Sequence, residues 1–211
     1  MKSLVITGVL LWLQLVQPPA APAGAAESPV AATAAAPLDR AALADSVRAE
    51  LLHCWRGYEK YAWGHDELRP VSHTVRDWYA VPVLMTPVDA LDALILMDCR
   101  PEAARAESLI VNTLSFDSDI SVKTFEVTIR LLGGLLSGYQ MTGNPRLLAL
   151  ADDLGTRLLP AFNSPTGLPY VNVNLKRGAV EGTKTNPAEI GTLLVEFGTL
   201  ARLTHKPIYY D

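Results

Sequence analysis

Residues 121–143 read SVKTFEVTIRLLGGLLSGYQMTG and predict one helix with a mostly apolar surface. Apolar side chains recur there at helical spacing, which predicts a stripe facing a core: Phe125, Ile129, Leu131, Leu132, Leu135, Leu136 and Tyr139. A second row, with one residue in every four, consists of Glu126, Arg130, Gly134 and Gly138. Glu126 and Arg130 therefore share a face, and the glycines beside them leave room for another group to approach. The alternative is an ordinary surface ion pair worth a few tenths of a kcal/mol.

Capping signals place further helices on both sides of this stretch. Gly143 closes the helix, Asn144 caps the next one and Pro145 takes its first position, so that helix runs to about Leu159. Asp39 is the expected cap of a helix over 39–61 with an inner face of Leu43, Val47, Leu51, Trp55 and Tyr58. Other helices are expected at 87–98, 101–114 and 186–203.

The remaining segments are expected to be loops. Residues 64–86 contain Pro70 and Pro82 and predict irregular structure. Residues 160–185 contain strand-like pieces around Tyr170–Leu175, which predict a hairpin or an extended loop. Paired helices without alternating strands indicate an all-α fold.

Composition limits the class of protein. The chain has 211 residues, of which 49% are hydrophobic and 19% charged, so it has the material for one domain with a substantial core. The net charge of −4 and the lack of a Lys/Arg cluster argue against nucleic acid as a partner.

The N-terminus predicts export. Lys2 precedes the apolar run Leu4–Val16, which is shorter than the ~20 residues a spanning helix needs. Ala23-Gly-Ala25 follows as a small-residue cleavage site, so we expect a signal peptide over 1–25, a flexible lead-in over 26–37 and one domain over 38–211. The expected location is periplasmic or secreted, with a secretory-pathway lumen as the alternative and no stable membrane span. An uncleaved anchor is the other interpretation of the apolar run.

Cys54 and Cys99 are the only cysteines. In an oxidising compartment they have the opportunity to form a disulfide, but two buried free thiols are an equally good interpretation.

Four segments together resemble glycoside hydrolase family 47, the class I α-1,2-mannosidases. They occur in the family's order over about 50–210: Tyr58–Pro70, Pro87–Leu94, Phe116–Asp119 with Phe125–Gly134, and Ala161–Tyr170 with Ala188–Phe197. The resemblance implies an (α/α)7 barrel, of which this chain supplies about the first three helix hairpins. An open part of a barrel leaves apolar faces uncovered, so we expect a fragment or a truncated reading frame.

The resemblance implies inverting hydrolysis of terminal α-1,2-linked mannose in mannose-rich oligosaccharides or N-glycans. Such a reaction needs one carboxyl as acid and a second one to activate water. The family motif places the general acid at Glu126. A direct ion pair with Arg130 would favour ionised Glu126 and oppose this role, so burial or nearby carboxylates must outweigh it, or the proton passes through water.

The resemblance also implies substrate-binding residues, namely Arg130, Asp89, Glu189 and Glu67. Asp89 has an alternative role as an acid in the first turn of a helix. Glu189 pairs with Asn186 in a pattern typical of a capping box, which is compatible with a pocket role. Glu67 follows His65 and Asp66 in what we interpret as a pocket rim or structural loop, since three adjacent residues do not form a metal shell. Glu196 is either a buried polar residue or part of the pocket wall.

The family uses Ca²⁺, whose ligands we expect mainly beyond residue 211, together with the general base. No metal ligand is predicted in this chain, which we therefore expect to be inactive alone and, at full length, a monomer. A mannosidase-like lectin that binds mannose-rich glycans without turnover is the second hypothesis. A plain helical scaffold is the third.

Overall fold

The computed structural model describes residues 38–210, so the predicted signal peptide and the lead-in lie outside the described residues. The helices and strands belong to the unit Asp39–Asp211. No helix within 38–210 is long and apolar enough to span a bilayer.

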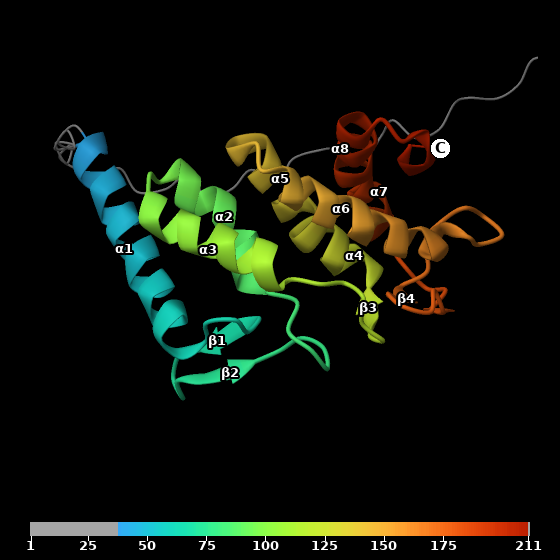
Figure 1. Ribbon diagram of the computed structural model, residues 1–211, viewed down its shortest axis with the longest axis horizontal. Coiled ribbons are helices and arrows are strands. Elements are labelled where there is room, and N and C mark those ends of the chain that lie inside the picture. The colour runs from blue at the N-terminus through green and yellow to red at the C-terminus, as the bar shows by residue number, and fades with distance from the viewer. Residues whose placement is uncertain (1–37, 211) are drawn as a thin grey trace, which may run out of the picture. The chain divides into compact units, whose positions relative to one another are not determined.

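Helix α1 (Arg40–Tyr61) begins where the sequence predicts, because the Asp39 carboxylate accepts hydrogen bonds from the Ala41 and Ala42 amides at 3.0 and 3.1 Å. Its inner face was predicted only in part. Trp55 and Tyr58 are buried, but Leu43 and Val47 are 49% and 45% exposed. All buried and half-buried residues of α1 lie between Leu51 and Tyr61, in the half of the helix that meets the first hairpin (Figure 1).

The first hairpin, β1 (Glu67–Arg69) and β2 (Thr74–Arg76), lies in the segment predicted to be irregular. Its strands are antiparallel, with Leu68 opposite Val75. The prediction missed the hairpin because three-residue strands carry too little alternation to be recognised. Asp66, immediately before β1, is fully buried.

Helices α2 (Met85–Leu96) and α3 (Arg100–Thr113) confirm the predicted pair within two residues. Helix α2 packs against α3 on one side and α5 on the other (Figure 1). Cys99, the residue before α3, is buried, whereas Cys54 on α1 is exposed, and both are free thiols.

The stretch 121–143 is helical without a break from Thr124 to Thr142, but a π-helical turn lies inside this helix and the first three residues form a strand. It consists of β3 (Ser121–Lys123), α4 (Thr124–Val127), a π-helical turn η1 (Thr128–Leu132) and α5 (Gly133–Thr142). The four leucines of the predicted stripe are buried, whereas Phe125, Ile129 and Tyr139 are half-buried. Strand β3 is formed by pairing with residues far along the chain, which local periodicity does not report.

The space left by the glycines is occupied by α2. A Cβ added to Gly134 would lie 2.7 Å from both Val88 Cγ1 and the Val88 carbonyl oxygen, and one added to Gly138 would lie 2.8 Å from Leu91 Cδ2. The glycines therefore allow close helix packing and do not form an open site.

We expect Gly134→Ala to lower the free energy of unfolding by about 1–3 kcal/mol, because the backbone of α2 must move to admit the methyl group. Gly198→Ala on α8 is the matched control, since a Cβ there meets nothing within 4 Å. Alanine should stabilise that site by about 0.5–1 kcal/mol through helix propensity. Urea unfolding of the two variants measures both values, and equal stabilities would contradict the packing argument.

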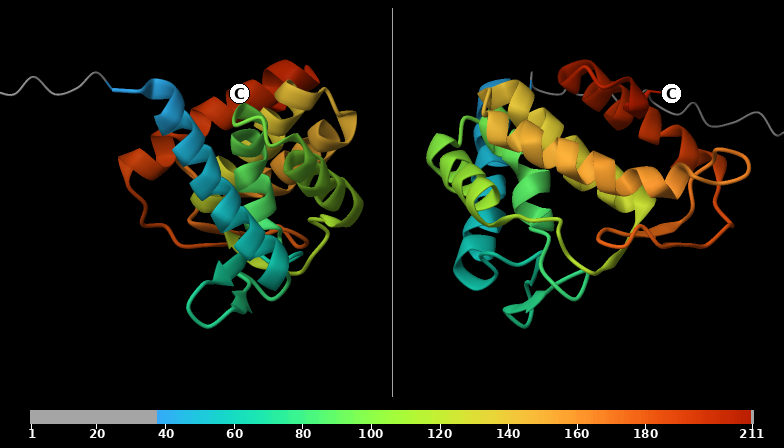
Figure 2. Two further views of the ribbon diagram at one scale, coloured as in Figure 1. Left: turned by 90° about the vertical axis from the view of Figure 1, so that its left-hand side faces the viewer. Right: turned by 45° about the vertical axis from the view of Figure 1, so that its right-hand side comes forward.

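Helix α6 (Pro145–Leu158) starts as predicted, with Gly143 at φ +72° and the Asn144 side chain accepting from the Arg146 amide at 3.0 Å. It continues as a 3-10 turn, η2 (Leu159–Phe162). Helix α6 packs between α5 and α8 (Figure 2).

The predicted hairpin is present as β4 (Asn172–Asn174) and β5 (Val180–Glu181). Strand β3 joins it to make a three-stranded antiparallel sheet in which Val173 lies opposite both Val122 and Val180. Both sheets lie along one edge of the helical unit, below the helices in Figure 1.

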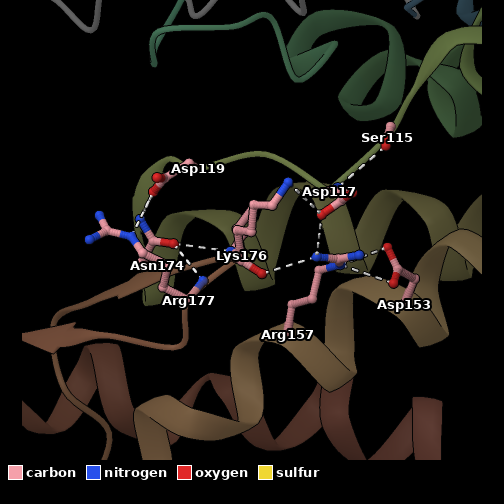
Figure 3. Close-up of polar contacts among 9 residues, drawn as sticks. Ser115, Asp117, Asp119, Asp153, Arg157, Asn174, Lys176 and Arg177 are labelled. Atoms are coloured by element: carbon pink, nitrogen blue, oxygen red, sulfur yellow. Dashed lines mark hydrogen bonds and ion pairs between the residues drawn. The ribbon is translucent and has the colours of Figure 1, made fainter.

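Polar side chains tie the β4–β5 turn to its surroundings (Figure 3). Asp119 accepts hydrogen bonds at 2.8 Å from Asn174 Nδ2 and from Arg177 Nε, and the Asn174 bond is the largest cause of the lowered pKa of Asp119. Arg157 of α6 donates to the Leu175 carbonyl at 3.1 Å. These contacts fix the sheet that leads into α4.

The last predicted helix is divided at Thr192 into α7 (Pro187–Gly191) and α8 (Leu193–Thr204), followed by a 3-10 turn, η3 (Pro207–Tyr209). The glycine that ends α7 is a weak helix former. Helices α2, α3, α5, α6 and α8 pack in succession, through α2 with α3, α2 with α5, α5 with α6 and α6 with α8.

Candidate active site

Arg130 lies between two carboxylates. Its Nε donates to Glu126 Oε2 and its Nη1 to Asp89 Oδ2, both at 3.1 Å. Strand β3 and helix α4 bring Glu126 to this point, and α2 brings Asp89. The predicted Glu126–Arg130 pair is thus confirmed and joined by a third predicted residue.

Lys123 adds a second basic side chain to this group of carboxylates. Its Nζ lies 3.0 Å from Glu189 Oε1 and 3.9 Å from Glu126 Oε1. Glu189 comes from α7, where the Asn186 side chain caps the helix by accepting from the Glu189 amide at 3.0 Å. Only this half of the capping pattern is present, because the Glu189 side chain binds Lys123.

Glu67 reaches the same group through an aromatic ring. The Trp78 indole Nε1 donates to Glu67 Oε1 at 2.6 Å, and the Arg130 guanidinium carbon lies 5.3 Å from the centre of the Trp78 ring. The structure therefore brings together Glu67, Asp89, Glu126, Arg130 and Glu189, linked by Trp78 and Lys123.

Burial and charge act on these groups in opposite directions. Desolvation raises the pKa of Asp89, while its hydrogen bond with Arg130 lowers it in part. The hydrogen bond with Glu126 is the largest cause of the raised pKa of Arg130. Arg130 stays charged and holds two carboxylates that are a quarter to a third exposed.

Glu196 on α8 is a further carboxyl beside this helix. A Cβ added to Gly133 would lie 3.5 Å from Glu196 Cγ, so the side chain borders the start of α5. Desolvation raises the pKa of Glu196, and its Oε2 is buried without a hydrogen-bond partner in the part of the chain that the structure describes. A buried carboxylate oxygen of this kind needs a hydrogen-bond donor from outside residues 38–210, such as a water molecule.

Asp66 and His65 have structural roles. Asp66 accepts from three backbone amides, those of Trp78, Val83 and Met85, at 2.7–3.1 Å. His65 Nδ1 lies 3.0 Å from Asp77 Oδ2. The structural-loop interpretation is thus correct for both residues, and Glu67 alone of the triplet faces the candidate site.

Three site residues were missed by the sequence analysis: Lys123, Trp78 and Tyr79, whose hydroxyl accepts from the Lys123 amide at 3.3 Å. Trp78 and Tyr79 lie in a loop without periodicity. Lys123 stands three residues before Glu126, a spacing that suggests contact only within a helix, and it lies in a strand. The signal that could have identified Lys123 was the need of the acidic motif residues for a nearby cation.

A wider hollow lies away from the candidate site. It has a volume of about 570 Å³ and is lined by Glu59, Trp63, Arg105, Ser108, Leu109 and Asn112. A narrow one borders the candidate site on the side of Glu189, Thr124 and Tyr170. The site residues of this chain therefore form an open polar surface.

Comparison with known proteins identifies the family of this chain. The family model described as glycosyl hydrolase family 47 matches residues 50–211. The chain belongs to glycosyl hydrolase family 47.

Relatives match this chain over a part of their length. The human endoplasmic reticulum mannosyl-oligosaccharide 1,2-alpha-mannosidase is 41% identical over 157 residues, which is 72% of this chain and 22% of that protein. The mannosyl-oligosaccharide 1,2-alpha-mannosidase of Candida albicans is 38% identical over 170 residues, 78% of this chain and 30% of that protein. This chain therefore spans less than a third of the length of these curated relatives.

A solved family 47 structure confirms the fold class. The alpha-1,2-mannosidase from Trichoderma reesei superposes with a TM-score of 0.72 at 30% identity, covering 80% of this chain and 38% of that one. The fold is that of the (α/α)7 barrel, of which this chain is a part.

Proposed function

We propose that the full-length protein removes terminal α-1,2-linked mannose from mannose-rich oligosaccharides, with inversion at the anomeric carbon. The supporting observation is the group of five acidic and basic motif residues that meets around Arg130 in a family 47 chain. The names of the human and Candida relatives support the substrate class.

Glu126 is proposed as the general acid. It lies at the start of a helix, and its side chain is 24% exposed. Its Oε2 accepts from Arg130 Nε at 3.1 Å, so the group that would protonate the leaving oxygen is held by a cation in the state described. We infer that sugar binding displaces Arg130 from Glu126, or that water carries the proton to the leaving oxygen.

Arg130, Asp89, Glu189 and Glu67 are proposed to bind the sugar. Their oxygens and nitrogens accept and donate as sugar hydroxyls require. Arg130 is the central one, because its guanidinium contacts Asp89 and Glu126 and stacks over Trp78. Glu196 is a further candidate because its buried oxygen lacks a partner among residues 38–210.

Ca²⁺ and the catalytic base are proposed to be held by residues beyond 211. Within 38–210 no group of three or more His, Cys, Asp or Glu side chains is arranged to hold a metal ion. The residues described do not fit a calcium site. Export through a cleaved signal peptide, to a periplasm or a secretory lumen, is part of the same proposal.

The ion pair itself favours a second function. A Glu126 that stays bound to Arg130 would contribute to the binding of mannose-rich glycans without cleaving them, as in a lectin.

Incubation of the full-length protein with α-1,2-mannobiose distinguishes the two functions. We expect free mannose, appearing first as the β-anomer by proton NMR, and its loss on chelation of Ca²⁺ by EGTA. Binding of the disaccharide without release at saturating Ca²⁺ would support the lectin, and initial release of the α-anomer would contradict inversion.

A further inference from the structure

Residues 183–191 connect β5 to α8 and are almost fully exposed. Helix α7, within this segment, buries no residue, and only Glu189 and Ile190 are half-buried. Exposed segments with few buried contacts open at low free energy. Something must therefore hold Glu189 at the candidate site.

One side-chain contact does so. Apart from bonds within the segment and to α8, into which it continues, residues 183–191 make one hydrogen bond to the rest of the described chain. It joins Lys123 Nζ to Glu189 Oε1 at 3.0 Å. A narrow hollow between Thr185 and Glu189 on one side and Thr124 and Phe125 on the other underlies the segment.

Lys123, by contrast, is held firmly. It is the last residue of β3 and lies opposite Asn172 in the sheet. Its amide donates to the Tyr79 hydroxyl at 3.3 Å, and its Nζ lies 5.4 Å from the centre of the Phe125 ring. The backbone of Lys123 is thus held by the sheet, whereas that of Glu189 belongs to a segment with little burial.

The charge of Lys123 also separates two carboxylates. Glu126 and Glu189 both approach it, at 3.9 and 3.0 Å, and would repel each other without a cation between them. Arg130 pairs with Glu126 from the other side and also pairs with Asp89, but it forms no ion pair with Glu189.

We propose that Lys123 is a positioning residue that fastens Glu189, and with it the segment 183–191, beside Glu126. This inference rests on the proposed function for its catalytic consequence, but the fastening itself does not depend on activity. Lys123 acts through Glu189 on substrate binding.

A double-mutant cycle in the full-length protein tests the catalytic consequence. We expect Lys123→Met to raise KM for α-1,2-mannobiose roughly fivefold while kcat changes less than about twofold. In a Glu189→Gln background the same change should have almost no further effect, and Lys123→Arg should restore KM. A fall in kcat, or additive effects of the two changes, would overturn the proposal by placing the action of Lys123 on Glu126.

Amide hydrogen exchange gives a second readout, which can be measured even if the wild-type protein is inactive. We expect exchange at 184–191 to be at least about threefold faster in Lys123→Met and in Glu189→Gln alike. Lys176→Met is the control, because that lysine lies 3.6 Å from Asp117, outside the candidate site. Absence of mannose release sinks the proposed function, whereas unchanged exchange in Lys123→Met sinks the fastening role.

Discussion

Glu126→Gln should reduce kcat for α-1,2-mannose release by about 10³-fold in the full-length protein. Glutamine has the shape of glutamate, and its oxygen still accepts from Arg130 Nε, a bond of 3.1 Å in the native protein. Its amide N–H groups are too weakly acidic to protonate the leaving oxygen, so the loss falls on the chemical step. KM should change little, since Arg130, Asp89 and Glu189 are retained.

The rate is to be measured beside Glu102→Gln as a matched control. Glu102 forms an i,i+3 ion pair with Arg105 on α3, outside the candidate site. Its removal should leave kcat within about twofold, in line with the small value of exposed pairs. A Glu126→Gln enzyme as active as this control would remove Glu126 from the mechanism.

Asp66→Ala should cause the largest loss of stability, about 4 kcal/mol in the free energy of unfolding. Asp66 is fully buried, and its carboxylate accepts from the Trp78, Val83 and Met85 amides. Its own carbonyl accepts from Thr86 Oγ1 at 2.6 Å, a bond that the variant retains. Three buried amides would be left without an acceptor, at about 1–3 kcal/mol each before relaxation.

Two further variants sharpen this measurement by urea unfolding. Asp66→Asn keeps one acceptor oxygen and turns an amide group toward the donors, so it should fall between wild type and Asp66→Ala. Asp98→Asn removes the exposed ion pair with Arg100, keeps a residue that tolerates the φ of +56° at this position, and should change stability by less than about 0.5 kcal/mol. If Asp66→Ala matches Asp98→Asn, the buried carboxylate does not organise the loop between β2 and α2.

The helix boundaries were predictable because their causes are local. Asp39 and Asn144 cap with their own side chains, and Gly143 adopts the left-handed conformation that ends a helix. Strand β3 was not predictable, because Ser121–Lys123 becomes a strand by pairing with Asn172–Asn174, some fifty residues later. Leu43 and Val47 were assigned to a core because periodicity gives a face but does not say what covers it.

The sequence predicted which motif residues belong to the candidate site, but not all of the contacts between them. Spacing alone indicated the pair Glu126–Arg130, and the family resemblance supplied Asp89, Glu189 and Glu67. Their connection through Lys123 and Trp78 depends on side chains from a strand and a loop, which only the tertiary structure brings together. The assignment of roles to these five residues stays a prediction.

The π-helical turn Thr128–Leu132 sets the direction of Glu126, which lies before it in the helix, relative to that of Gly134, which lies after it. Each residue turns an α-helix by about 100°, so a turn that holds one extra residue shifts everything after it by that angle. Glu126 precedes the turn, and Gly134, which must meet the α2 backbone, follows it. Loss of a single codon within this turn would therefore leave the acid in place and rotate the packing face away from its partner.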